Sequence, residues 1–126
     1  MVTKPANSEQ KKWMDDITDY INFNGLGELY GEEYEGDINI QRHHVLGRSA
    51  KQNKVAIGHW FVIPVPFALH DPSMNHEFHV GKCKKAFVIR FGTQRDLFDT
   101  MYHNMHSEGY KVPSVDVYNA IMETGS

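Results

Sequence analysis

The chain has 126 residues, a length typical of one domain, and its 40% hydrophobic and 23% charged residues are typical of globular proteins. No apolar run approaches the roughly 20 residues that span a bilayer, which argues against a membrane-embedded class. The net charge of −3 hides a division: residues 38–95 carry nine of the 13 basic residues and six of the eight histidines, whereas residues 1–37 and 96–126 are acidic.

Cysteine content and the N-terminal sequence indicate the cellular setting. The stretch MVTKPANSEQKK has no apolar segment like that of a secretory signal, and the single Cys83 cannot form an internal disulfide. We therefore expect a reducing, cytoplasmic environment.

Residues 1–37 are expected to form an acidic helix followed by a loop. Ser8 can cap a helix. Its apolar residues recur at helical spacing: Trp13, Ile17, Tyr20 and Ile21. The stretch NGLGELYGEEYEGD is rich in glycine and acid, which is typical of a loop, and it lacks the G-x-G-x-x-G spacing of a phosphate-binding turn.

Two strands are predicted in the basic middle of the chain. Residues 38–46 alternate with a period of two, which predicts a strand with His43 and His44 on opposite faces. Residues 55–65 are rich in β-branched and aromatic side chains and predict a second strand that forms a hairpin with the first. Pro64 and Pro66 cannot donate to a strand ladder and should mark the end of that strand.

Helices are predicted in the rest of the chain. Asp71 or Ser73 can begin a helix and Gly92 can end one, although AFVIRF alone is compatible with a short strand. A capping box at Thr93 precedes an apolar stripe at helical spacing: Leu97, Phe98, Met101 and Met105. A last helix is expected from Pro113 or Ser114, with these residues facing inward: Val117, Tyr118, Ile121 and Met122.

The order strand, strand, helix, with paired histidines on the first strand, resembles the HNH or ββα-metal nuclease finger. The nearest subgroup is the phage recombination-enhancing, RecA-dependent nuclease family. The stretches HHVLGR, HWFVIPVPFALHD and KKAFVIRFGTQRDLF carry the resemblance, within about residues 38–100. It implies a ββα-metal, HNH-like core in residues 38–92. From the chain length and the patterns above, we expect a single α+β domain over residues 1–126, in which the acidic helix and loop of 1–37 and the helices of 93–126 flank this core.

The resemblance implies roles for four histidines in a metal-dependent endonuclease. His43 and His70 would be metal ligands, His44 the general base, and His59 the occupant of a supporting position that most often holds asparagine in the broader family. The CxxC pairs of many HNH fingers are absent, and Asp71-Pro72 interrupts a His-x-x-x-His repeat after His70.

The last metal ligand is open between two histidines. We favour His76 over His79, because His76 follows the expected helix start at Ser73 more closely.

The residue types suit phosphodiester hydrolysis. Histidine has an ordinary pKa of about 6.5, so much of it is neutral and able to accept a proton from water near neutral pH. Imidazole ligands favour zinc or nickel, while phosphate oxygens and water also accept manganese or magnesium, so the expected cofactor is one of these divalent ions. Because adjacent strand residues point to opposite faces, His43 and His44 can share one site only if the strand twists or bulges, which Gly47 would tolerate.

The basic residues of the middle segment are expected to contact DNA phosphates without reading sequence. The candidates are Arg42, Arg48, Lys51, Lys54, Lys82, Lys84 and Lys85. The resemblance suggests single-stranded DNA or recombination intermediates as substrate and a RecA-type recombinase as a partner. A phage-encoded chain would act in the host cytoplasm.

Two other classes are compatible with the sequence. Three or four histidines can close a tetrahedral zinc site, which would make a non-catalytic module that binds DNA or a host protein. An adaptor built on the acidic N-terminal helix would leave the basic middle unexplained. The acidic ends could also shield the basic segment, in which case deletion of residues 1–37 should raise DNA affinity.

Overall fold

A two-stranded antiparallel sheet links the segments that carry the histidines. The computed structural model describes residues 5–126. In it, β1 (Ile40–His44) pairs with β4 (Val62–Pro66), and each residue of β1 has one partner in β4. Helices predominate around this sheet and a second small hairpin, so the expected α+β class is confirmed. The first predicted strand is confirmed for five residues, although it ends before Leu46.

Pro64 can lie in the middle of β4 because it turns its backbone polar groups away from β1. Tyr30 Oη donates a hydrogen bond of 2.6 Å to the Pro64 carbonyl oxygen. The nitrogen and the carbonyl of a strand residue point to the same side, so the missing N–H of Pro64 lies on the outer edge, where no ladder needs it. Pro64 therefore does not end the strand, whereas β4 does end at Pro66, as expected.

The second strand predicted over residues 55–65 is divided. Its first residues form β3 (Val55–Ala56), which pairs with β2 (Lys51–Gln52) in a separate hairpin. The turn between them places Asn53 and Lys54 at φ of 51° and 66°, as a tight two-residue hairpin turn requires. Residues 57–61 then form a turn that leads into β4.

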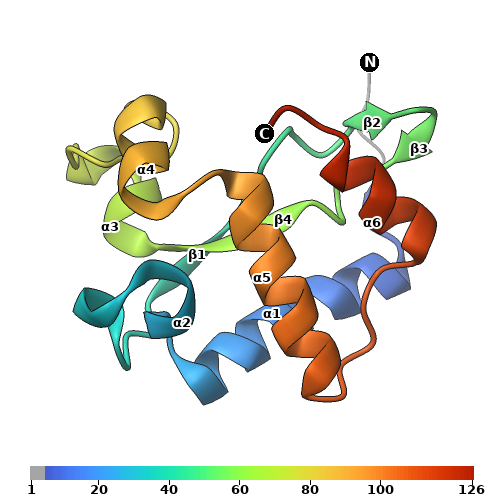
Figure 1. Cartoon of the computed structure of the whole chain (residues 1–126), viewed down its shortest axis with the longest axis horizontal. Coiled ribbons are helices and arrows are strands. Elements are labelled where there is room, and N and C mark those ends of the chain that lie inside the picture. The colour runs from blue at the N-terminus through green and yellow to red at the C-terminus, as the bar shows by residue number, and fades with distance from the viewer. Residues whose placement is uncertain (1–4) are drawn as a thin grey trace.

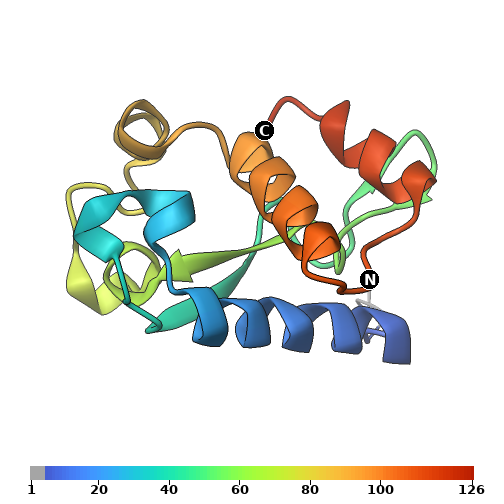
Figure 2. The ribbon, with the colours of Figure 1, turned by 60° about the horizontal axis from the view of Figure 1, so that its bottom comes forward.

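Helices cover both faces of β4. Helix α1 (Ser8–Asn24) and helix α5 (Gln94–Ser107) both contact this strand, and Figure 2 shows them on opposite sides of it. Asn7, rather than Ser8, caps α1, in a capping box with Gln10. Thr93 caps α5 as predicted. The apolar residues predicted to face inward on these two helices are buried: Trp13, Ile17, Tyr20, Ile21, Leu97, Phe98, Met101 and Met105.

The helix expected to run from Asp71 or Ser73 to Gly92 is broken into pieces. One turn, α3 (Phe67–His70), follows β4 directly, and a 3-10 turn, η2 (Pro72–Met74), comes next. Pro72 has no N–H, and Asp71 before it is extended, which separates these turns. A loop over residues 75–83 leads to α4 (Lys84–Phe91), so AFVIRF is helical and the strand alternative is wrong.

Short helices also occupy part of the acidic segment that was expected to be a loop. These are α2 (Gly27–Tyr30) and η1 (Glu32–Tyr34), and Tyr30 is buried against Phe91 of α4. The last helix, α6 (Val115–Met122), begins after its cap Ser114 as predicted (Figure 1). Within residues 5–126, none of the helices has the length and apolar character required to cross a membrane.

Candidate active site

His43 and His70 come together although they lie 27 positions apart in the sequence. Their rings meet edge to face with centroids 5.1 Å apart. Helix α3 starts directly after β4, and its single turn brings His70 back over β1. The Phe67 amide, at the start of α3, donates a hydrogen bond of 2.9 Å to the Asn39 carbonyl oxygen, next to β1. The antiparallel pairing and the short helix therefore create this imidazole pair.

A glutamine fixes one nitrogen of His70. The His70 Nδ1 is hydrogen-bonded to Gln41 Oε1, and Gln41 Nε2 donates to Asp71 Oδ2 at 3.3 Å. Gln41 lies two residues before His43 on β1, so both side chains project from the same face of the strand. His70 thus has Nε2 left for a further ligand.

Both imidazoles of this pair are held in the neutral form. Burial lowers the pKa of His43 to about 4, with help from the nearby His70, and the side chain of Gln94 on α5 counteracts part of the shift. Burial likewise lowers the pKa of His70, and His79 adds to the effect. A neutral imidazole has the lone pair that metal coordination requires.

Gln94 lies at the first turn of α5 and is almost fully buried, with 3% of its surface exposed. Its Oε1 has no hydrogen-bond partner that meets normal geometry among residues 5–126. The site therefore includes a buried amide side chain beside His43, whose hydrogen bond to the imidazole raises the pKa of His43.

His44 and His59 form a second imidazole pair. Their ring centroids lie 5.4 Å apart. Burial is the largest cause of the lowered pKa of His44, followed by His59 and Arg48. His44 Nε2 is enclosed and has no hydrogen bond within the described part of the chain.

The two pairs lie on opposite faces of β1. His43 contacts His70, whereas Arg42, which shares the face of His44, is bound to Asp15 and Thr18 of α1. The β1–β4 register contains no bulge, so the distortion that would aim both neighbouring histidines at one point is not formed. His44 is the last residue of β1, and it still contributes to the lowered pKa of His43.

The two histidines considered as the last ligand have different surroundings. His79 is buried, its Nε2 bonds to the His70 carbonyl at 2.9 Å, and its Nδ1 accepts from the amides of Gly81 and Lys82 at 3.0 Å each. Both of its nitrogens are therefore occupied.

His76, the favoured ligand, accepts a 3.0 Å hydrogen bond at Nδ1 from the Phe78 amide and packs on the Phe78 ring. Over residues 5–126, no three His, Cys, Asp or Glu side chains group as a metal site would require, so His76 does not join His43 and His70.

The basic residues expected to contact DNA lie in two main regions. Arg48, Lys51 and Lys54 lie at the β2–β3 hairpin, and Lys82, Lys84 and Lys85 lie at the start of α4; all six are exposed. In both ribbon views the N-terminal end of α5 lies between these two regions (Figures 1 and 2). Arg42 differs from them, because it forms a 2.8 Å ion pair with Asp15.

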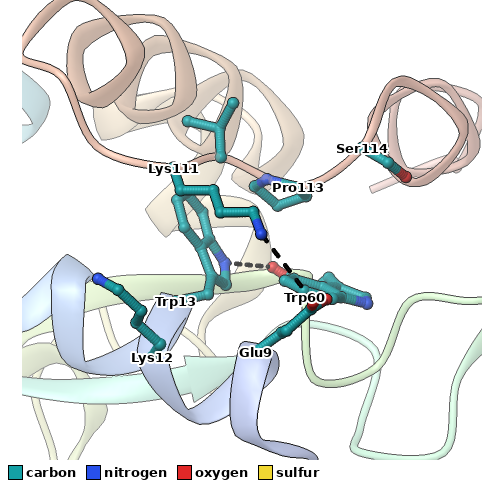
Figure 3. Close-up of a pocket in the computed structure, with 8 residues that line it drawn as sticks. Glu9, Lys12, Trp13, Trp60, Lys111, Pro113 and Ser114 are labelled. Atoms are coloured by element: carbon teal, nitrogen blue, oxygen red, sulfur yellow. Dashed lines mark hydrogen bonds and ion pairs between the residues drawn. The ribbon is translucent and has the colours of Figure 1, made fainter.

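A cavity of about 250 Å³ lies away from the histidine pairs, between α1, the turn before β4 and the start of α6 (Figure 3). The Trp13 indole N–H donates to the Trp60 carbonyl at 3.0 Å, and Lys111 lies 3.9 Å from Glu9 at the rim. None of the candidate site residues lines this cavity.

Sequence reasoning missed the amide and carboxylate partners of the histidines. Gln41 could have been found, since it shares a strand face with His43 at a spacing of two residues. Gln94 and Asp71 had no such signal, because their approach to the site depends on where α5 begins and where the chain breaks after α3.

No protein-family model matches the chain, and neither a curated protein nor a solved structure matches it significantly. Function is therefore inferred from the residues themselves and from the motif that they resemble.

Proposed function

We propose that this protein is a metal-dependent endodeoxyribonuclease of the HNH type, which hydrolyses phosphodiester bonds with a histidine base. The meeting of His43 and His70 carries the proposal. One imidazole comes from the first strand of an antiparallel pair, and the other from the helical turn that follows the second strand. This succession is the one expected of a ββα-metal finger.

The residues of the pair suit a divalent ion. His43 and His70 are neutral, and the hydrogen bond of His70 Nδ1 to Gln41 leaves Nε2 for coordination. Two imidazoles leave other coordination positions for water and phosphate oxygen. When bound, zinc, nickel, manganese or magnesium would supply positive charge that stabilises the transition state of phosphodiester hydrolysis.

His44 is the proposed general base. Its lowered pKa keeps it neutral near pH 7, and its enclosed Nε2 leaves Nδ1 as the nitrogen that would take a proton from water. His59 lies edge to face against its ring and would hold the ring in place. Since His44 ends β1, a phosphate lying across the end of this strand is the position from which both faces can be reached.

DNA is the proposed substrate. The exposed basic residues at the β2–β3 hairpin and at the start of α4 would contact phosphates on either side of the N-terminal end of α5. The resemblance to the RecA-dependent family extends this proposal to single-stranded DNA or recombination intermediates, to a recombinase partner and to action in the cytoplasm.

A plasmid nicking assay with magnesium, manganese, nickel and zinc tests the proposal. We expect wild-type protein to nick supercoiled DNA, and His44→Ala to lower the rate by about 10²- to 10⁴-fold while retaining metal binding. His43→Ala and His70→Ala should lower metal affinity as well. His106→Ala replaces an exposed histidine of α5 and should behave as wild type.

Two results would contradict parts of the proposal. Normal cleavage by His44→Ala would remove His44 from the role of base. Metal binding by the wild-type protein without nicking by any of the four ions would favour the histidine–zinc binding module.

A further inference from the structure

Gln41 connects a ligand imidazole to an anchored carboxylate. Its side chain is half-buried on β1, with Oε1 at His70 Nδ1 and Nε2 donating to Asp71 Oδ2 at 3.3 Å. Asp71 is fixed in turn, because its Oδ1 accepts from the Ser73 amide at 2.9 Å and from the Ser73 hydroxyl at 2.5 Å. Four residues from β1, α3 and η2 thus form one continuous chain of hydrogen bonds.

The donors and acceptors of this chain allow only one arrangement. An ionised carboxylate accepts hydrogen bonds and cannot donate them, so the Gln41 NH₂ group must face Asp71. The Gln41 carbonyl oxygen must then face His70, and a carbonyl oxygen requires a donor. His70 Nδ1 therefore carries the proton.

We propose that Gln41 is a positioning residue, which holds His70 in the tautomer protonated at Nδ1 so that Nε2 presents its lone pair. This inference rests on the proposed metal-binding role of His70. Partners that orient a ligand histidine through its other nitrogen typically change metal affinity when they are removed.

The surroundings of His70 support this role. His79 donates from Nε2 to the His70 carbonyl at 2.9 Å, so the backbone and the ring of His70 are each held by a hydrogen bond. Among residues 5–126, His70 Nε2 makes no hydrogen bond, in contrast to both nitrogens of His79.

The test reads the tautomer directly in metal-free full-length protein, from nitrogen–proton correlation spectra of the imidazole rings. We expect wild-type His70 to be protonated at Nδ1. Gln41→Leu should shift His70 towards the Nε2-protonated form and weaken zinc binding, measured by calorimetry, by about 10- to 100-fold. Gln41→Glu keeps an acceptor at His70 Nδ1 and should therefore keep the Nδ1-protonated tautomer, although it replaces the donor to Asp71 with a second carboxylate.

Gln52→Leu is the matched control, because Gln52 is a half-buried strand residue of β2. It should change neither the tautomer nor the affinity. If Gln41→Leu does not fold, Gln41→Met provides the same length without the amide. Wild-type His70 protonated at Nε2, or an unchanged tautomer in Gln41→Leu, would overturn the inference. The expected tautomers and zinc affinities in a protein that does not nick DNA would uphold Gln41 and reject the nuclease.

Discussion

Hydrogen bonds at single residues decide which histidines can do chemistry. His70 and His79 lie close together, yet His79 uses both nitrogens to hold backbone groups, while His70 uses one nitrogen for Gln41. In the sequence, only the distance from the expected helix start at Ser73 favoured His76 over His79 as a ligand. The hydrogen bonds give a better criterion, because a nitrogen that holds a structural hydrogen bond has no lone pair to offer.

The buried neutral histidines should make the metal-free protein sensitive to acid. The pKa of His43 is about 4 in the folded protein and about 6.5 in the unfolded chain, so the unfolded chain binds more protons between these values. Stability is therefore complete above pH 6.5 and is lost as the pH falls towards 4, in the same direction as for His44 and His70.

We expect His43 alone to contribute roughly 2 kcal/mol to this loss, because its ring keeps some contact with water. Urea unfolding of metal-free protein at pH 7, 6, 5 and 4 measures it. His43→Asn should flatten the pH dependence relative to wild type. A wild-type free energy of unfolding that stays constant from pH 7 to pH 4.5 would show that the imidazoles titrate freely.

At the scale of elements, the turn that carries His59 depends on a glycine. A Cβ on Gly58 would lie 2.1 Å from the Arg48 carbonyl oxygen and 2.3 Å from the Arg48 carbonyl carbon. The Gly58 amide also donates to the Ala50 carbonyl at 3.1 Å, so the two segments are held together there. Gly58 thus lets the chain close against residues 47–50 immediately before His59.

Gly58→Ala should destabilise the protein, since the atoms in the way are backbone atoms that cannot rotate aside. We expect a loss of about 1–3 kcal/mol in the free energy of unfolding by urea, and a displaced His59. Gly125→Ala is the control, because a Cβ there meets no atom within 4 Å. Equal unfolding midpoints for the two variants would mean that the Arg48 turn can move freely.

Local signals explain which elements could be predicted. Caps and apolar stripes predicted α5 after its cap Thr93 and α6 within two residues of its start at Val115, and alternation predicted β1. The second predicted strand was wrong in its extent, although its last part pairs with β1. Residues 55–65 are uniformly suited to strands, but the turn over residues 57–61 separates β3 from β4, and the turn at Asn53 and Lys54 pairs β3 with β2 instead. The helix after β4 was misplaced because Pro72 acts on the chain before it as well as after it.

The candidate site was predictable in its residue types and less so in its grouping. His43 and His70 meet as the motif implies, and His44 meets His59. Whether His43 and His44 serve one site depends on a bulge in β1. A bulge leaves no clear mark in the sequence, so its absence became known only from the strand register. The single-domain division of the chain stays a prediction.

Across the part of the chain that the structure describes, two ion pairs join the acidic N-terminal segment to the basic middle segment. Asp15 pairs with Arg42 and Glu33 pairs with Arg90, each at 2.8 Å. These contacts agree with the expectation that acidic residues shield basic ones. Deletion of residues 1–37 cannot test it, because α1 buries Trp13 and neighbouring core residues and its loss would unfold the protein.

Single charge removals test the shielding instead. Asp15→Asn and Glu33→Gln should each raise affinity for single-stranded DNA by about 1.4- to fivefold, equivalent to the 0.2–1 kcal/mol of an exposed ion pair. The gain should shrink at high salt, as measured by fluorescence anisotropy. Asp116→Asn removes a charge from the exposed start of α6 and is the control. A gain of the same size in all three variants would reduce the effect to net charge.

The prolines of β4 have a consequence for how copies of this protein can associate. Amyloid growth, domain exchange and strand donation by a partner all require an open row of N–H donors along a sheet edge. The outer edge of β4 lacks the donor at Pro64, and Tyr30 already occupies the carbonyl of that residue. Self-assembly by adding strands to this side of the sheet is therefore disfavoured, and contacts between copies would have to use side chains.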